Sequence, residues 1–227
     1  MTEVLRPLAS ETVAIVGVGG TGSHVLDFVC KAKVKEIHIF DDDDYDEETP
    51  RRSPGPPATG DARYKVTRHA DRYAALHDLI VPHPERIGED NAERLTPFDT
   101  VFLCSGGSGR FKSKILDVCM RSGALLIDVG MAAYVSGRET INAMVRVTTL
   151  TRENHDHAGR IGLHESGTDP ATRNLQTVEL NALNAALAVI QWKQFRGVYR
   201  DIKHEMHCVY DVQANCLSNR YTSRSRN

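Results

Sequence analysis

The sequence lacks paired cysteine motifs, long apolar runs and an excess of charge of one sign. Its five cysteines are widely spaced and form no Cys-x-x-Cys, which argues against a disulfide framework and against a four-thiolate zinc site. No apolar run approaches the roughly 18 residues that a membrane-spanning helix needs, and no leader opens the chain, so we expect a cytoplasmic protein without a signal peptide. The formal net charge of −2 gives no reason to expect binding to nucleic acid or to a membrane.

The most informative segment is a glycine-rich turn within VAIVGVGGTGSHVLDFV, residues 13–29. Its β-branched start predicts a buried strand, and the apolar residues after the turn have helical spacing. Four glycines allow a tight turn and let backbone amides approach a ligand: Gly17, Gly19, Gly20 and Gly22. The N–H groups at the start of such a helix favour an anion, so the segment indicates an anion-binding site, although a turn without a ligand has the same local pattern.

A second strand and an acidic residue strengthen this interpretation. Residues 34–40, VKEIHIF, predict a strand that is followed directly by Asp41. A Rossmann-like unit places an acid at about this point, where it can contact the ribose hydroxyls of a nucleotide. A dinucleotide would suit the same residues, so a nicotinamide- or flavin-dependent oxidoreductase stays an alternative, although we find no residue constellation for hydride chemistry.

Predicted strands and helices alternate up to about residue 131, which is the order of a mostly parallel sheet flanked by helices. Residues 140–151 alternate like an antiparallel strand, a long helix covers residues 174–195, and residues 203–221 predict two short strands. We therefore expect an α/β, Rossmann-like fold with antiparallel strands toward the C-terminus. The long helix should supply core or subunit-contact residues, namely Leu180, Leu183, Leu187, Ile190 and Trp192.

The length of 227 residues suits one α/β domain over residues 1–227. Two polar segments within it predict loops. Residues 41–60 are acidic and then proline-rich, which is typical of a mobile loop, and residues 150–173 predict a polar, crossover-like loop.

With Arg52 and Lys65 included, the pattern resembles the ThiF/MoeB/ubiquitin-activating enzyme superfamily over about residues 13–192. The family's Gly-x-Gly-Gly-x-Gly matches residues 17–22, and its Asp-x-Asp after the second strand matches Asp41 and Asp43. Its arginine beyond the first aspartate matches Arg52, and the lysine that opens its third helix matches Lys65. The family's asparagine in this region is replaced by Thr49.

The resemblance implies a ThiF-type adenylyltransferase that binds ATP and Mg²⁺, adenylates the C-terminal carboxylate of a ubiquitin-like or sulfur-carrier protein, and releases pyrophosphate. It assigns nucleotide binding to the four glycines of the turn together with Asp41, Asp43, Arg52 and Lys65. Arg52 and Lys65 would also be catalytic, because they would hold the triphosphate and offset charge during attack on the α-phosphorus. We expect truncation of either side chain to leave thermal stability nearly unchanged. The resemblance further implies a homodimer and allows a conjugating-enzyme partner.

The chain departs from the family pattern in two places. An ungapped alignment of residues 101–119 puts Gly107 where the family has its Mg²⁺-binding aspartate. Either Asp43, Asp128 or a neighbouring acid takes over, which leaves the metal ligands unassigned, or the protein is a nucleotide-binding sensor or scaffold with weakened catalysis. The second departure is that residues 151–173 contain no cysteine for a thioester, while the later Cys208 and Cys216 are expected to be buried and structural.

Overall fold

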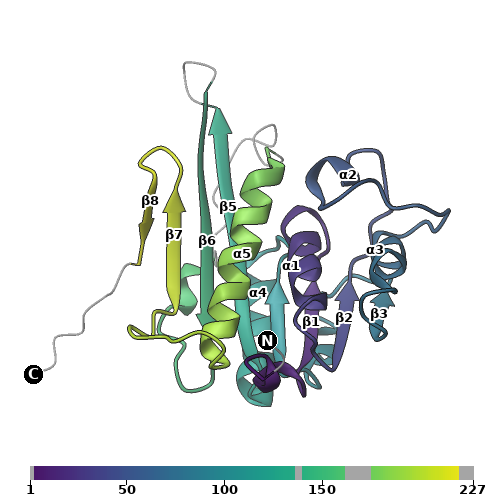
Figure 1. Ribbon diagram of the computed structural model, residues 1–227. Coiled ribbons are helices and arrows are strands. Elements are labelled where there is room, and N and C mark those ends of the chain that lie inside the picture. Colours follow the sequence, from purple (N-terminus) through teal and green to yellow (C-terminus); the bar gives the residue numbers. More distant parts are fainter. Residues whose placement is uncertain (1–2, 136–139, 162–174, 220–227) are drawn as a thin grey trace, which may run out of the picture.

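An eight-stranded sheet organises the protein (Figure 1). The computed structural model describes residues 3–135, 140–161 and 175–219. In their order across the sheet, the strands are β3 (Ile80–His83), β2 (Glu36–Phe40), β1 (Thr12–Val16), β4 (Thr100–Leu103), β5 (Leu125–Val135), β6 (Ile141–Leu150), β7 (His207–Asp211) and β8 (Cys216–Ser218). Strands β1 to β5 pair in parallel, and β6, β7 and β8 continue the sheet antiparallel. The predicted fold class is therefore confirmed.

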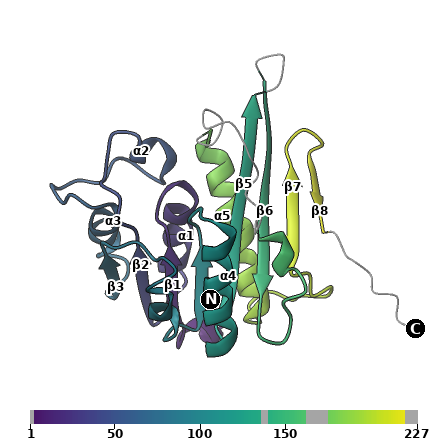
Figure 2. The same cartoon turned by 180° about the vertical axis from the view of Figure 1, so that it is seen from behind.

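Helices cover both faces of the parallel part of the sheet (Figures 1 and 2). One face carries α1 (Gly20–Cys30), α3 (Lys65–Tyr73) and α5 (Val178–Phe195), and the other carries α4 (Gly109–Ser122) with the 3₁₀ turn η2 (Ala92–Leu95). The short helix α2 (Thr49–Arg52) packs against α1 and α5. Two further 3₁₀ turns are η1 (Arg6–Leu8) and η3 (Ala158–Arg160).

Side chains of β1 alternate between the two faces. Val13 and Ile15 pack into the cluster that includes α1 and α5, whereas Ala14 and Val16 pack into the cluster that includes α4. All four are at most 2% exposed. Because helices cover both faces, a central parallel strand is apolar on both sides, which is why residues 13–16 are recognisable as a buried strand from sequence.

The predicted core or subunit-contact residues of helix α5 differ in burial. Leu180 and Trp192 are buried, Leu183 and Leu187 are half-buried, and Ile190 is 43% exposed. The buried face of the helix instead includes two asparagines, Asn181 and Asn184. The apolar pattern could not predict them, because asparagine is mostly a surface residue.

Segment boundaries differ from the expectations at several points. Strand β5 continues to Val135, past residue 131, up to which strands and helices were expected to alternate. The loop predicted over residues 41–60 contains α2 and is fastened by Arg72, whose guanidinium donates to the carbonyls of Pro54 and Pro56. Of the loop predicted over residues 150–173, residues 162–173 lie outside the described part of the chain.

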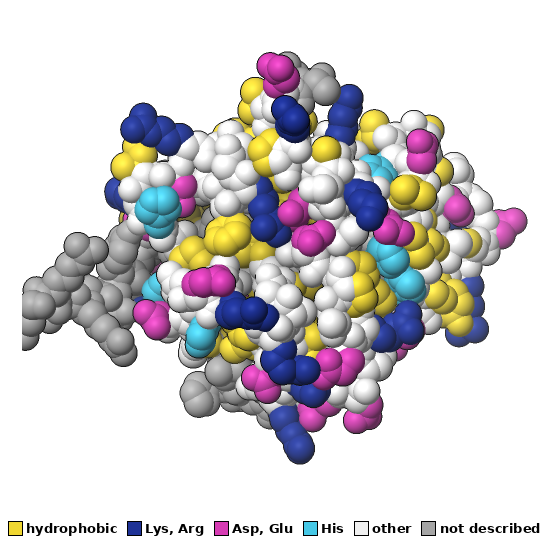
Figure 3. Space-filling view, turned by 90° about the horizontal axis from the view of Figure 1, so that it is seen from below, with side chains coloured by type: hydrophobic (Ala, Val, Ile, Leu, Met, Phe, Trp, Pro, Cys, Tyr) yellow, Lys and Arg dark blue, Asp and Glu magenta, His cyan; other side chains and the backbone are white. Residues whose placement is uncertain are grey.

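The strand order reverses between β1 and β4, since β2 and β3 lie on one side and β5 on the other. Open α/β sheets bind ligands outside the carboxyl ends of the strands at such a point. The opposite end of the sheet, seen from below in Figure 3, carries acidic and basic side chains side by side over its described residues. No helix in the described part of the chain has both the length and the apolar character that a bilayer crossing requires.

Candidate functional site

The glycine turn lies at the point where the strand order reverses. Gly17 has a φ of +87°, and its amide donates to the Phe40 carbonyl at the end of β2. A Cβ at Gly17 would lie 2.9 Å from the Ser105 amide nitrogen, in the turn after β4. The residue therefore must be glycine because the turns after β1 and β4 meet there.

The other three glycines of the turn have different environments. A Cβ at Gly20 would clash with the Asn181 side chain of α5, and a Cβ at Gly22 would clash with the Gly17 carbonyl. Packing therefore explains these two glycines without a ligand. A Cβ at Gly19 would meet nothing within 4 Å. Gly19 also precedes α1, whose first turn has no side-chain cap, so this is the part of the turn left open to a ligand.

Asp41 fastens the glycine turn to the loop after β2. Its Oδ2 accepts a hydrogen bond from the Val18 amide at 2.8 Å, and its Oδ1 accepts one from the Asp43 amide at 3.0 Å. Burial raises the pKa of the Asp41 carboxyl, and these hydrogen bonds oppose the rise. Each carboxylate oxygen still has acceptor capacity that a ribose hydroxyl could use.

Lys65 is the first residue of α3, and its side chain is buried. It is 5% exposed, and its Nζ lies 2.7 Å from Asp43 Oδ2. Its backbone amide also donates to the Asp43 carbonyl. Because the Lys65 side chain is itself buried, truncation at this position would remove packed atoms and is expected to lower stability, contrary to the expectation from sequence.

Arg52 and Thr49 belong to α2. The Thr49 hydroxyl donates to Asp46 Oδ1 at 2.7 Å and the Thr49 amide donates to the same oxygen, so the residue at the family's asparagine position stabilises its own helix start. These contacts also lower the pKa of Asp46. The half-buried Arg52 guanidinium has no hydrogen bond or ion pair with any residue that the structure describes. Among the described residues, Arg52 is thus a cation without a partner. It lies on α2, which packs against α1 and α5.

A pocket of about 210 Å³, which we call the Asp41 pocket, lies at the carboxyl ends of β1, β2 and β4. Its lining includes Gly17, all three acids of residues 41–43, Arg86, Ser105 and Gly106. Three of the predicted site residues therefore come together here, namely Gly17, Asp41 and Asp43. Lys65 joins them through Asp43, whereas Arg52 is not among the described lining residues.

A second pocket of about 410 Å³, which we call the Arg146 pocket, shares Ser105 and Gly106 with the first. Its charged lining residues are Lys112 and Arg146. Behind them Asp128 is fully buried, with Oδ1 2.9 Å from Lys112 Nζ and Oδ2 2.5 Å from an Arg146 terminal nitrogen. Sequence analysis missed this ion triad, because its members come from α4, β5 and β6 and only packing joins them.

The triad bears on whether Asp128 could hold a metal ion. Both oxygens of Asp128 are ion-paired, so this residue is not available as an Mg²⁺ ligand. In the described residues, the acids whose ligand atoms lie close enough to share a cation are Asp41, Asp42 and Asp43, within 4.8 Å of one another. Carboxylate oxygens are suitable ligands for Mg²⁺, so the chemistry of this donor set fits the ion.

Two neighbouring glycines in the turn after β4 differ in the space around their Cβ positions. A Cβ at Gly107 would clash with the Phe111 ring, and Gly107 lines neither pocket among the described residues. Gly106 has open space around its Cβ position and lines both pockets. A carboxylate that faces the pockets would therefore be carried by residue 106, one residue earlier than the ungapped alignment indicates.

The cysteines differ from their expected roles at one position. Cys208 is buried in β7, and burial raises the pKa of its thiol to about 11. The expectation of a buried structural residue is confirmed for Cys208. It is wrong for Cys216, which is exposed because β8 is the last strand of the sheet. The exposed position leaves the thiol accessible. However, Cys216 lies on the edge strand β8, several strands away from β1, β2 and β4, whose carboxyl ends form the Asp41 pocket.

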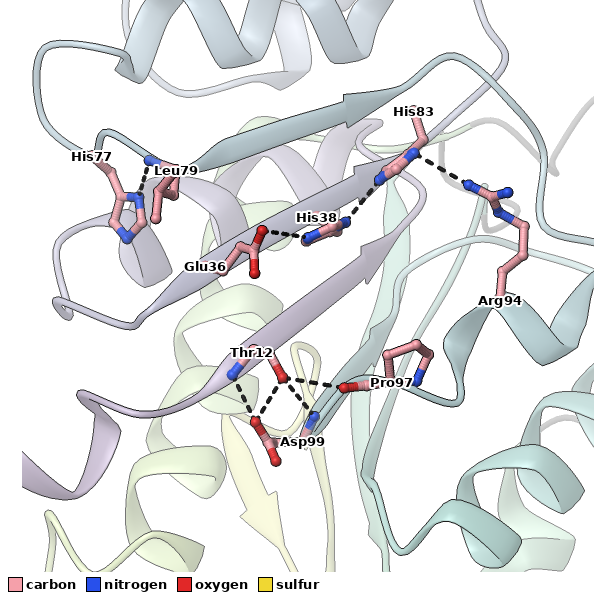
Figure 4. A network of polar contacts seen from close by, with 9 residues as sticks. All are labelled: Thr12, Glu36, His38, His77, Leu79, His83, Arg94, Pro97 and Asp99. Atoms are coloured by element: carbon pink, nitrogen blue, oxygen red, sulfur yellow. Dashed lines mark hydrogen bonds and ion pairs between the residues drawn. The ribbon is translucent and has the colours of Figure 1, made fainter.

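A separate polar network joins β2 to β3 (Figure 4). His38 Nδ1 lies 2.8 Å from His83 Nε2, and Glu36 and Arg94 contact the two outer ring nitrogens. Burial, the neighbouring His38 and Arg94 lower the pKa of His83. None of these four residues lines the Asp41 or Arg146 pocket, and the network holds the edge of the sheet.

A model of the ThiF family matches residues 2–192 of the chain. The adenylyltransferase and sulfurtransferase UBA4 of Lodderomyces elongisporus is 28% identical over 142 residues, which are 60% of this chain and 30% of that protein. The chain thus spans less than a third of the length of this relative.

Solved structures show the same fold at low identity. E. coli MccB with ATP has a TM-score of 0.74 at 16% identity, over 99% of this chain and 67% of that chain. PaaA has a TM-score of 0.74 at 13% identity, over 95% of this chain and 65% of that chain. The microcin C7 biosynthetic enzyme MccB in complex with N-formylated MccA has a TM-score of 0.69 at 16% identity, over 96% and 67%. This chain therefore spans about two thirds of the length of these proteins.

Proposed function

Because the chain belongs to the ThiF family, we propose that it is an adenylyltransferase that uses ATP and Mg²⁺ to activate the C-terminal carboxylate of a ubiquitin-like protein, a sulfur carrier or a peptide. The observation that carries the proposal is the meeting of two pockets at Ser105 and Gly106. One pocket offers the Asp41 carboxylate for a ribose, and the other offers two cations that could attract an anionic substrate. This arrangement suits a reaction that joins the two ligands.

In the proposed reaction, a carboxylate oxygen attacks the α-phosphorus of ATP, and the bond from that phosphorus to the pyrophosphate oxygen breaks. The products are an acyl-adenylate and pyrophosphate. Asp41 would hold the ribose, and the uncapped start of α1 after Gly19 would face the phosphates. Arg52 and Lys65 would offset phosphate charge, so catalysis is positional and electrostatic and needs no acid or base.

Asp42 and Asp43 are the exposed members of the acidic group and would supply carboxylates to a bound Mg²⁺. The ion would neutralise charge on the phosphates. Asp43 also pairs with Lys65, so the Asp43 carboxylate would contact both the metal ion and this buried cation. MccB has been determined with ATP, which supports the choice of nucleotide.

Replacing Arg52 by alanine is expected to lower the rate of pyrophosphate exchange into ATP more than tenfold, about 1.4 kcal/mol. The melting temperature should change little, because the guanidinium has no partner among the described residues to leave behind. The matched control is Arg51→Ala, which removes the neighbouring, exposed arginine that pairs with Glu48. Equal exchange rates in the two variants would contradict the role of Arg52.

We also propose that the protein is a homodimer that shares the outer side of α5 and β8. A groove there is lined by the apolar residues Leu187, Ile190, Ile202 and Leu217, of which Ile202 is 75% exposed. The neighbouring edge strand β8 presents unpaired backbone groups. Apolar surface of this kind is typical of a protein interface.

Light scattering at micromolar concentration is expected to give twice the mass of one chain. The variant Ile202→Glu should be monomeric, because it replaces an apolar contact in the groove by a charge that would lose its hydration on association. Leu76→Glu is the matched control, since Leu76 is also exposed but lies next to the opposite edge of the sheet. A monomeric wild-type protein would rule out the proposed dimer.

Two alternatives remain open to test. A nucleotide sensor or scaffold is favoured by the glycine at position 106 and by the use of the Thr49 hydroxyl within α2. A dinucleotide-dependent oxidoreductase would use the same glycine turn and Asp41. Binding of ATP without exchange would favour the first alternative, and tight binding of NAD without binding of ATP would favour the second.

A further inference from the structure

We propose that the Arg146 pocket selects the last residue of the substrate, and that this residue carries an acidic side chain. The inference rests on the proposed adenylation, because it takes the reacting carboxylate to lie at Ser105 and Gly106, where the two pockets meet. The side chain of the same residue would then extend into the Arg146 pocket.

The charge of the pocket favours an anion. Among its described lining residues, Lys112 and Arg146 are charged and no acid is present. Asp128 lies behind this wall and balances one of the two cations. One positive charge remains, in a partly buried setting where a matching carboxylate is bound more strongly than at an open surface.

The cations are fixed in place before any ligand arrives. Lys112 is 7% exposed, and one terminal nitrogen of Arg146 donates to the Thr148 hydroxyl at 2.7 Å while the other contacts Asp128. A Cβ at Gly130 would lie 2.6 Å from the Arg146 guanidinium, so glycine at this position makes room for it. A preorganised cation loses little freedom when the ligand binds.

A buried asparagine in the pocket offers an acceptor that the backbone of a peptide could use. Asn184 is 1% exposed and lines the pocket, and its Nδ2 donates to the Gly130 carbonyl at 3.1 Å. Since a carbonyl can only accept, this bond fixes the orientation of the amide, and the remaining Oδ1 has no partner among the described residues. A buried acceptor of this kind needs an N–H donor, which the backbone amide of the last residue could supply.

The size of the pocket argues against a terminal glycine. Its volume of about 410 Å³ is walled on several sides by apolar side chains, including Val129, Met131, Met144 and Val209. A side chain with an aliphatic stem would bury that stem against these walls and place its charge at the cations. A terminal glycine would leave both the walls and the cations without a contact.

Calorimetric titration with N-acetylated peptides that end in Glu, Gln or Gly and are otherwise identical would test the inference. The Glu peptide is expected to bind at least tenfold more tightly than the other two. Lys112→Met should remove this preference, because it leaves Asp128 paired with Arg146 and the pocket without net charge. The control Lys114→Met removes an exposed cation two residues away on α4 and should keep the preference.

If Lys112→Met does not fold, Gly130→Ala serves as the second variant, because its methyl group pushes the Arg146 guanidinium away from the pocket wall. Equal affinity for the three peptides, or no measurable binding of any of them, would overturn the inference. A preference for Glu without pyrophosphate exchange would instead support the pocket assignment and refute adenylation. The two proposals can therefore fail separately.

Discussion

Replacing Asp128 by alanine is expected to lower the free energy of unfolding by about 3–5 kcal/mol, the usual cost of breaking a buried ion pair by removing one partner. Asp128 is fully buried, and its two oxygens balance Lys112 and Arg146. The substitution would leave the buried Lys112 and the half-buried Arg146 without their carboxylate. Urea denaturation followed by circular dichroism measures this loss.

Asp117→Ala is the matched control for this experiment. Asp117 lies on the exposed side of α4, so its loss should change the free energy of unfolding by less than about 0.5 kcal/mol. The double variant Asp128→Ala, Lys112→Met should be more stable than Asp128→Ala alone, because one uncompensated cation is removed with the acid. A loss below about 1 kcal/mol for Asp128→Ala would contradict the structural role of the triad.

Replacing Asp41 by alanine is expected to weaken ATP binding well beyond tenfold, which corresponds to about 1.4 kcal/mol. The variant would lose the proposed acceptor for the ribose hydroxyls. It would also release the Val18 and Asp43 amides, which the same carboxylate holds in the apo protein. Both losses disturb the turn where the phosphates are proposed to lie.

Calorimetric titration of ATP measures this effect, with Glu47→Ala as the control. Glu47 is an exposed acid of the same loop and is not among the described lining residues of either pocket, so its loss should change the affinity much less. A melting curve of each variant separates loss of binding from loss of the fold. Unchanged ATP affinity in a folded Asp41→Ala protein would show that the nucleotide lies elsewhere.

The strand, the turn and the acid of this site could be predicted because their signals are local. A β-branched run, closely spaced glycines and an acid directly after the next strand occur within about thirty residues of each other. The same holds for the antiparallel strands, whose alternating pattern is visible in residues 140–151. These features depend on backbone geometry more than on distant neighbours.

What could not be predicted depends on contacts between distant segments. Gly20 is glycine because the Asn181 side chain packs on it. Asn181 also accepts a hydrogen bond from the neighbouring Thr21, which is 160 residues away in the sequence. The ion triad joins three elements, and the buried Lys65 pairs with Asp43, which lies 22 residues earlier in the chain. Whether a side chain fits at residue 106 or at residue 107 depends on the position of the Phe111 ring, which blocks the Cβ position of Gly107.

The most direct test of adenylation is isotope exchange between labelled pyrophosphate and ATP, with a substrate that has a free C-terminal carboxylate. We expect the wild-type protein to exchange only when ATP, Mg²⁺ and this substrate are all present. Gly106→Asp should raise the rate at least about tenfold by adding a carboxylate that faces both pockets, whereas Gly107→Asp should not, because its side chain would collide with Phe111. Absence of exchange in both the wild type and Gly106→Asp, with ATP bound by each, would contradict adenylation and favour a nucleotide-binding sensor or scaffold.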